Sequence, residues 1–177
     1  SDVVVVATPT LVHATTMRAV LRSFQPTTLL CEKPLAFELT DAGEMLQGAL
    51  TQDCKVFVNY MRSAEPGCIE VKNRMVDGRI GKLEKGVVWY SKGLFNNGSH
   101  FLNLLQYWLG DVTNFPIVHR GRLWDGVDTE PDVVVWFGDL RILFLAAREE
   151  NFSHYTIELI AANDRLRYKK GGEQIIW

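Results

Sequence analysis

The sequence lacks the features that would place a protein in a membrane, in a secretory pathway or on nucleic acid. No apolar run approaches the ~18 residues of a membrane span, and residues 1–7 lack the charged start of a signal peptide. The net charge is −2, and no cluster of lysine and arginine follows one predicted face, so nucleic-acid binding has no support. We therefore expect a cytoplasmic protein that binds neither membrane nor nucleic acid.

Cysteine is scarce as well. The three cysteines, Cys31, Cys54 and Cys68, are odd in number and have no Cys-x-x-Cys spacing, which argues against a disulfide framework and against a zinc site. A lone thiol at the end of a buried strand, such as Cys31, is much more often a packing residue than a nucleophile. Reduced, buried thiols and no metal site are the expectation.

What is present is an ordinary globular composition. Apolar residues make up 47% and charged residues 23% of the chain, which is enough to form a sizeable core. The 177 residues exceed the ~150-residue prior for one domain and fall short of two. One domain plus part of another is the expected organisation.

The first part of the chain alternates strands and helices. Strands are predicted at residues 2–7, 27–31 and 55–59, and helices at 11–24 and 40–51. The continuous β-branched run in residues 2–7 is typical of a strand buried on both faces of a parallel sheet, and Thr10 is available to cap the first helix. This alternation predicts right-handed βαβ crossovers and a parallel, doubly wound sheet.

After residue 60 the pattern changes to helices and successive strands. Helices are predicted at residues 66–77 and 99–109, the second capped by Ser99 and closed by Gly110. The predicted strands are 83–91, 117–123, 132–137, 141–148, 154–162 and 165–169. The fold class is therefore α/β plus α+β: the C-terminal part of a Rossmann-type parallel sheet, followed by a helix-backed, largely antiparallel open sheet.

The tripeptide Glu32-Lys33-Pro34 follows the second strand directly. Open α/β sheets bind their ligands over the carboxyl ends of the strands. An amine there is suited to bind a hydroxyl and manage its proton, since partial burial can lower the pKa of a lysine. The alternative is an exposed lysine that pairs with Glu32.

Three segments, residues 2–13, 32–34 and 93–100, occur in the order found in the Gfo/Idh/MocA oxidoreductases, which the chain resembles. In that family a Rossmann domain binds NAD or NADP. A second domain supplies an open sheet with one face toward the substrate and the other commonly used for oligomerisation. The resemblance implies a partial NAD(P)-binding domain in residues 1–62 and an incomplete substrate-binding and oligomerisation domain in 63–177.

The resemblance also implies the catalytic residues. Lys33 would hydrogen-bond the reacting oxygen, and His100 would be the general acid or base. Family members often carry Asp-x-x-x-His where this chain has Asn96 and His100; an amide can orient a hydroxyl but cannot take its proton. A capping or core histidine is the alternative for His100.

The remaining implied site residues divide between cofactor and substrate. The cofactor residues would be Thr8, Pro9, His13, Glu32, Lys33 and Pro34, with Pro34 a rigid turn residue in which a cis bond is an open alternative. The substrate residues would be Asn59, Tyr60, Arg62, Lys92 and Asn97. Three alternatives stay open: a solvated His13, an interdomain hydrogen-bond cluster at residues 59–62, and a strand-end Lys92 in water.

A dinucleotide site also needs a Gly-x-Gly-x-x-Gly turn between a strand and a helix, and no such turn occurs in these 177 residues. Because residues 2–7 match the family's fourth strand, we expect the first half of the Rossmann domain to precede Ser1, and the chain to stop within a strand at its other end. We expect the sheet to expose apolar surface, and this chain alone to have little affinity for NAD(P) and no activity.

The leading functional hypothesis is an oxidoreductase. It would transfer a hydride between NAD or NADP and the carbinol or carbonyl of a sugar, sugar nucleotide or polyol, and it would form a homo-oligomer through the C-terminal sheet. The alternative is a non-catalytic relative, a sugar-binding or dimerisation module. Asn96 and the absent glycine-rich turn favour that alternative.

Overall fold

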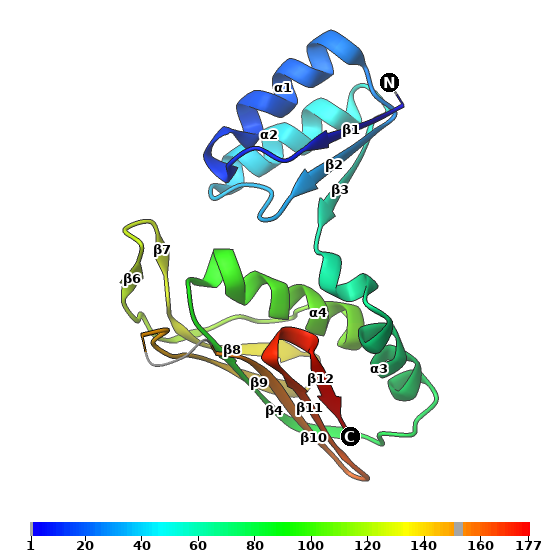
Figure 1. Cartoon of the computed structure of the whole chain (residues 1–177), viewed down its shortest axis with the longest axis vertical. Coiled ribbons are helices and arrows are strands. Elements are labelled where there is room, and N and C mark those ends of the chain that lie inside the picture. The colour runs from blue at the N-terminus through cyan, green and yellow to red at the C-terminus, as the bar shows by residue number, and fades with distance from the viewer. Residues whose placement is uncertain (1, 151–153) are drawn as a thin grey trace. The chain divides into compact units, whose positions relative to one another are not determined.

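The structure is a computed structural model that describes residues 2–150 and 154–177. The chain folds as two compact units, the first ending at Tyr60 and the second beginning at Met61 (Figure 1). Each unit has its own hydrophobic core.

The first unit is a three-stranded parallel sheet with two helices. Its strands, in the spatial order β1-β2-β3, are β1 (Val3–Val6), β2 (Thr28–Glu32) and β3 (Lys55–Asn59), and its helices are α1 (His13–Phe24) and α2 (Leu39–Leu50). Each strand pairs in parallel with the next one along the chain. Crossovers of one hand place both helices on the same face of such a sheet.

Only that face of the sheet is buried. Side chains alternate along a strand, and those on the helical face form the core with residues of both helices: Val6, Leu29, Cys31, Met17, Leu21, Met45 and Ala49. On the other face Val3, Val5 and Phe57 are 54%, 59% and 55% exposed. The predicted burial of residues 2–7 on both faces is therefore wrong for this unit, because α1 and α2 pack on one face.

The start of α1 also differs from the prediction. A 3-10 turn, Thr10–Val12, precedes the helix, and the Val12 amide donates to the Pro9 carbonyl at 3.0 Å. The residue that caps α1 is Val12, which has no side-chain hydrogen bond to the helix. Thr10 lies inside the turn instead of at the cap, so its expected capping role is wrong.

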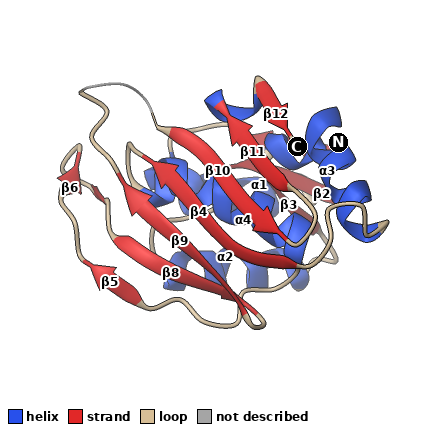
Figure 2. Cartoon of the chain, turned by 90° about the horizontal axis from the view of Figure 1, so that it is seen from below, coloured by secondary structure: helices blue, strands red, loops and turns tan. Residues whose placement is uncertain are grey.

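The second unit is a seven-stranded sheet with α3 (Pro66–Val76) and α4 (Ser99–Leu109) packed on one face (Figure 2). In spatial order the strands are β12 (Gln174–Ile176), β11 (Arg165–Lys169), β10 (Tyr155–Ala161), β4 (Leu83–Tyr90), β9 (Leu140–Ala146), β8 (Asp132–Phe137) and β5 (Ile117–His119). The central pair β4–β9 is parallel, and the other neighbours are antiparallel. The expected fold class is confirmed.

Large aromatic residues fill the core between helices and sheet. Phe101 and Trp108 of α4 meet Tyr168 of β11 edge to face, with ring centroids 6.4 and 6.2 Å apart, an arrangement that the ring quadrupoles favour. Phe144 and Tyr90 from the central strands are completely buried beside them. The opposite face of the sheet leaves Trp89, Leu143 and Ile160 partly exposed.

The predicted strand over residues 117–123 is broken in the structure. After β5 the chain leaves the sheet at Gly121, then forms β6 (Leu123–Trp124), which pairs with β7 (Asp128–Thr129) in a separate two-stranded hairpin. Gly121 has φ +68°, and a Cβ there would lie 1.7 Å from the Glu130 carbonyl oxygen. The close approach of two backbone segments, which only glycine permits, is what ends the strand.

The entry to α4 is different as well. A π-helical segment, Leu94–Gly98, runs directly into α4, and the Ser99 hydroxyl donates back to the Phe95 carbonyl at 2.6 Å. Ser99 therefore does not cap the helix, because the chain before it is already helical. Such π-helical turns occur frequently at functional sites.

Candidate active site

Lys33 lies at the carboxyl end of the parallel sheet, directly after β2 ends at Glu32. The Lys33–Pro34 peptide bond is cis. Glu32 pairs in register with Asn59, the last residue of β3, and its Oε1 accepts a hydrogen bond from Asn59 Nδ2 at 2.7 Å. Two neighbouring strand ends thus place a carboxylate and an amide beside the half-buried lysine, the position at which open α/β sheets bind ligands.

His13 holds the two loops of this site together. Its ring is completely buried. Nε2 lies 2.8 Å from the Thr8 carbonyl oxygen, and Nδ1 lies 3.1 Å from each of the Pro34 and Leu35 carbonyl oxygens. Carbonyl oxygens only accept hydrogen bonds, so each of these contacts requires a proton on the facing ring nitrogen, and a neutral imidazole can donate on one of its two sides only. His13 is therefore a buried link between the loop after β1 and the loop that carries Lys33, and the alternative of a solvated residue is wrong.

Replacing His13 with alanine should destabilise this unit by about 2–3 kcal/mol, because buried carbonyl oxygens would lose their donor. Hydrogen exchange of the β1 and β2 amides, followed by mass spectrometry, measures the change. Thr15→Ala, at an exposed position of the same helix, is the control and should alter exchange little. Equal protection in the His13→Ala variant and the wild type would show that the link carries no stability.

Cys31 lies against this histidine, with its Sγ 3.5 Å from His13 Nδ1. Burial, with a smaller contribution from the Glu32 carboxylate, raises the pKa of the Cys31 thiol to about 11. A protonated thiol is a poor nucleophile at neutral pH. Cys31 therefore serves packing, as the sequence predicted.

The second unit holds four more of the predicted residues. Lys92, Asn96 and Asn97 lie in the segment between β4 and α4, and His100 lies in the first turn of α4. Lys92 and Gly93 both have positive φ, +66° and +83°. Asn96 Nδ2 donates to the Lys92 carbonyl at 3.1 Å, and Asn97 Nδ2 donates to the Ser91 carbonyl at 2.7 Å. Asn97 is only 6% exposed, so its amide nitrogen holds the turn from inside.

Arg62 is engaged within the second unit. Its Nη1 donates to the Tyr168 hydroxyl at 3.1 Å and to the Gly171 carbonyl. Burial raises the pKa of Tyr168 to about 12, although the Arg62 charge opposes the shift. The predicted site residues are divided between the two units. The first unit carries Thr8, Pro9, Lys33, Asn59 and Tyr60, and the second carries Arg62, Lys92 and His100. A single site that joins the two sets stays a prediction.

Two buried carboxylates, Asp128 and Glu130, were missed by the sequence reasoning. Both accept hydrogen bonds from backbone amides of the turn at residues 92–96. Their signal in the sequence is a pair of acids two residues apart, beside Pro131 and ahead of an apolar strand. It is weak, because acids in such places are mostly solvated.

Within residues 2–150 and 154–177, no group of three histidine, cysteine, aspartate or glutamate side chains is placed to hold a metal ion. Over the same residues, no helix has the length and apolar character needed to cross a membrane.

Residues 1–60 match the model of the Gfo/Idh/MocA family, described as an oxidoreductase family with an NAD-binding Rossmann fold. No curated protein sequence matches the chain. Solved structures do match over nearly its full length. An inositol dehydrogenase homolog from Azotobacter vinelandii, complexed with NADH and myo-inositol, has a TM-score of 0.83 at 20% identity, covering 98% of this chain and 52% of the other.

Two further structures show the same fold. The WlbA dehydrogenase from Bordetella pertussis, in complex with NADH and UDP-GlcNAcA, has a TM-score of 0.86 at 15% identity, covering 100% of this chain and 58% of the other. An oxidoreductase from Agrobacterium radiobacter, in complex with NAD+, L-tartaric acid and magnesium, has a TM-score of 0.78 at 17% identity, covering 97% and 56%. The chain spans about half the length of the solved proteins it matches. Residues 1–60 therefore match the Gfo/Idh/MocA oxidoreductase family, and the chain as a whole has the fold of these dehydrogenases.

Proposed function

We propose that the intact protein is an NAD(P)-dependent oxidoreductase that transfers a hydride to or from a carbinol or carbonyl of a sugar, sugar nucleotide or polyol. The observation that carries the proposal is Lys33. It stands at a strand's carboxyl end beside the Glu32–Asn59 hydrogen bond, in a unit that matches an NAD-binding oxidoreductase family. The proposed substrate class is supported by the myo-inositol and UDP-GlcNAcA named in the similar structures.

The proposed roles follow from the chemistry of each side chain. When bound, the nicotinamide supplies or accepts the hydride. Lys33 would donate a hydrogen bond from Nζ to the reacting oxygen, and His100 would take or return the hydroxyl proton. Asn96 would orient that hydroxyl or the histidine, since an amide can donate and accept but cannot hold the proton.

The residues present fit one end of the dinucleotide. Thr8 Oγ1 is buried, and no hydrogen-bond partner for it occurs in the described part of the chain. It follows β1 beside Pro9, where a polar group of the nicotinamide end could reach it. Glu32, Pro34 and the loop that His13 holds would complete this part of the site. The pyrophosphate needs a glycine-rich turn that these 177 residues do not contain.

The substrate would be held by Asn59, Tyr60, Arg62, Lys92 and Asn97, of which Lys92 suits an anionic group.

We further propose self-association through the open face of the large sheet. There Val87 and Leu143 lie side by side in register, with Trp89 and Ile160 also partly exposed. Exposed apolar surface of this kind marks interaction sites. Three free cysteines favour a cytoplasmic location.

Titration of the intact protein with NADH and NADPH, followed by nicotinamide fluorescence, tests the proposal. We expect saturable binding of one cofactor and turnover with a sugar-type or polyol substrate. The 177-residue chain alone is the matched comparison and should bind far more weakly, because it lacks the pyrophosphate turn. Absence of both binding and turnover in the intact protein would refute the oxidoreductase.

The alternative is a non-catalytic relative that binds a sugar-type ligand. Asn96 favours it, because an amide stands where family members often carry an acid. If the intact protein binds such a ligand with unchanged affinity after both Lys33→Ala and His100→Ala, and shows no turnover, the alternative is correct.

A further inference from the structure

The turn at residues 92–96 is held from outside by two carboxylates. Glu130 Oε1 accepts the Lys92 and Gly93 amides at 2.7 and 3.3 Å. Asp128 Oδ1 and Oδ2 accept the Phe95 and Asn96 amides at 3.2 and 2.8 Å. The first amides of a helical segment have no partner within the segment. Here the partners are a side chain of β7 and one just after it, more than 30 residues away in the chain.

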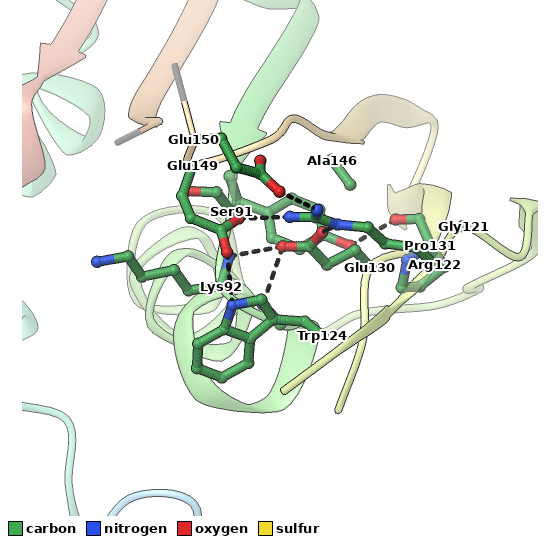
Figure 3. Close-up of polar contacts among 12 residues, drawn as sticks. Ser91, Lys92, Gly121, Arg122, Trp124, Glu130, Pro131, Ala146, Glu149 and Glu150 are labelled. Atoms are coloured by element: carbon green, nitrogen blue, oxygen red, sulfur yellow. Dashed lines mark hydrogen bonds and ion pairs between the residues drawn. The ribbon is translucent and has the colours of Figure 1, made fainter. Parts of the chain in front are cut away.

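Both carboxylates are nearly inaccessible to water, with Asp128 2% and Glu130 3% exposed. A buried carboxylate is stable only when its hydrogen bonds or an opposite charge replace the lost hydration. Glu130 has both, because Arg122 Nε donates to its second oxygen at 2.5 Å. Figure 3 shows the Arg122 guanidinium between Glu130 and the pair Glu149 and Glu150, with Trp124 donating to Glu149.

The backbone of the turn packs directly against Asp128. A Cβ at Gly93 would lie 2.0 Å from Asp128 Oδ2, so the backbone of the turn touches the carboxylate itself. The same short segment carries Asn96, and His100 follows in the first turn of α4. A displacement of the turn would therefore displace both side chains.

We propose that Asp128 and Glu130 are positioning residues, which fix the turn bearing Asn96 and His100 in the geometry needed for proton transfer. The proposal rests on the proposed oxidoreductase function. The hairpin formed by β6 and β7 thereby belongs to the site, although none of its side chains is given a chemical role. Arg122 acts through Glu130, whose charge it balances.

Asp128→Asn in the intact protein tests this role. Asparagine keeps the shape of the side chain, but it replaces one acceptor oxygen with an NH2 group. That group would face a backbone N–H donor and could not accept its hydrogen bond. We expect kcat to fall about 100-fold, the effect of a displacement of about 1 Å, with NADH affinity unchanged. Asp125→Asn, at the exposed tip of the same hairpin, is the matched control and should retain wild-type kcat.

A double-mutant cycle separates positioning from general destabilisation. If Asp128 acts through His100, Asp128→Asn should have little further effect in a His100→Ala background. An equal fold-change in both backgrounds, or no loss of kcat in the single variant, would overturn the proposal. Wild-type protein with no NADH binding and no turnover would instead refute the oxidoreductase function itself.

Hydrogen exchange provides a readout that needs no activity. The amides of residues 92–96 should exchange faster in Asp128→Asn and in Glu130→Gln, while the amides of β9 keep their wild-type protection. Unchanged exchange in the turn would show that the carboxylates do not hold it. Glu130→Gln also serves as the second variant if Asp128→Asn does not fold.

Discussion

Replacing Lys33 with methionine should lower kcat of the intact protein by about 10²–10⁴-fold, the usual contribution of a positioned acid or base. Methionine keeps the length and apolar stem of the side chain and removes the amine. The reacting oxygen would lose its hydrogen-bond donor at the point where charge develops. NADH binding, measured separately by fluorescence, should change far less than kcat.

Lys55→Met is the matched control for this prediction. Lys55 is the exposed first residue of β3, at the opposite end of the strand from Asn59, so its loss should leave kcat unaltered. If the Lys33→Met variant turns over at the wild-type rate, Lys33 has no part in the mechanism, while NADH binding and the family match of residues 1–60 are unaffected.

Replacing Phe144 with alanine should lower the free energy of unfolding of the second unit by about 3–5 kcal/mol, because the change leaves a large cavity in a close-packed core. Phe144 is fully buried in the central strand β9 and contacts Tyr90 edge to face. All five tryptophans lie after residue 60. Urea unfolding followed by tryptophan fluorescence therefore reports on this unit alone.

Leu143→Ala, one residue earlier in β9, is the control. Leu143 is 43% exposed on the open face, so in dilute solution, where self-association does not contribute, it should cost about 1 kcal/mol or less. Equal losses for the two variants would show that the assignment of inner and outer faces in β9 is wrong.

Much of the fold could be predicted because its local and long-range signals agree. The strand β3 and the strands β8 and β11 begin and end at the predicted residues, since apolar runs there are bounded by turn residues. Alternation of strands and helices was sufficient to predict the parallel sheet. The family resemblance, which rests on short motifs in order, was confirmed by the match of residues 1–60.

The errors arose where tertiary contacts decide local structure. Gly121 breaks a β-prone run because another backbone passes too closely, and no property of residues 117–123 shows this. Thr10 and Ser99 are good capping residues, yet a 3-10 turn and a π-helical segment precede the helices they were expected to cap. Propensity describes what a residue can do, and neighbouring segments determine whether it does so.

The candidate site was predicted unevenly for the same reason. Lys33 and His100 carry chemistry in their side chains and stand in recognisable motifs. Asp128 and Glu130 act on backbone amides more than 30 residues away in the chain, and no local pattern encodes such a partner. His13 was assigned to the cofactor. In the structure its buried ring contacts carbonyl groups of the two loops, and its contact with the cofactor stays a prediction.

The parallel pairing of β4 with β9 has a consequence for synthesis on the ribosome. The first unit pairs each strand with the next one along the chain, so it can fold while the rest is still being made. By contrast, β4 is flanked by β9 and β10, and Tyr90 pairs with Tyr155. At about 5–20 residues per second this partner emerges roughly 3–13 s later. β9 emerges earlier, so β4, with Trp89, has neither neighbour until β9 is made and lacks β10 over the whole interval. Nascent-chain chaperones would therefore have the longest time to bind at β4.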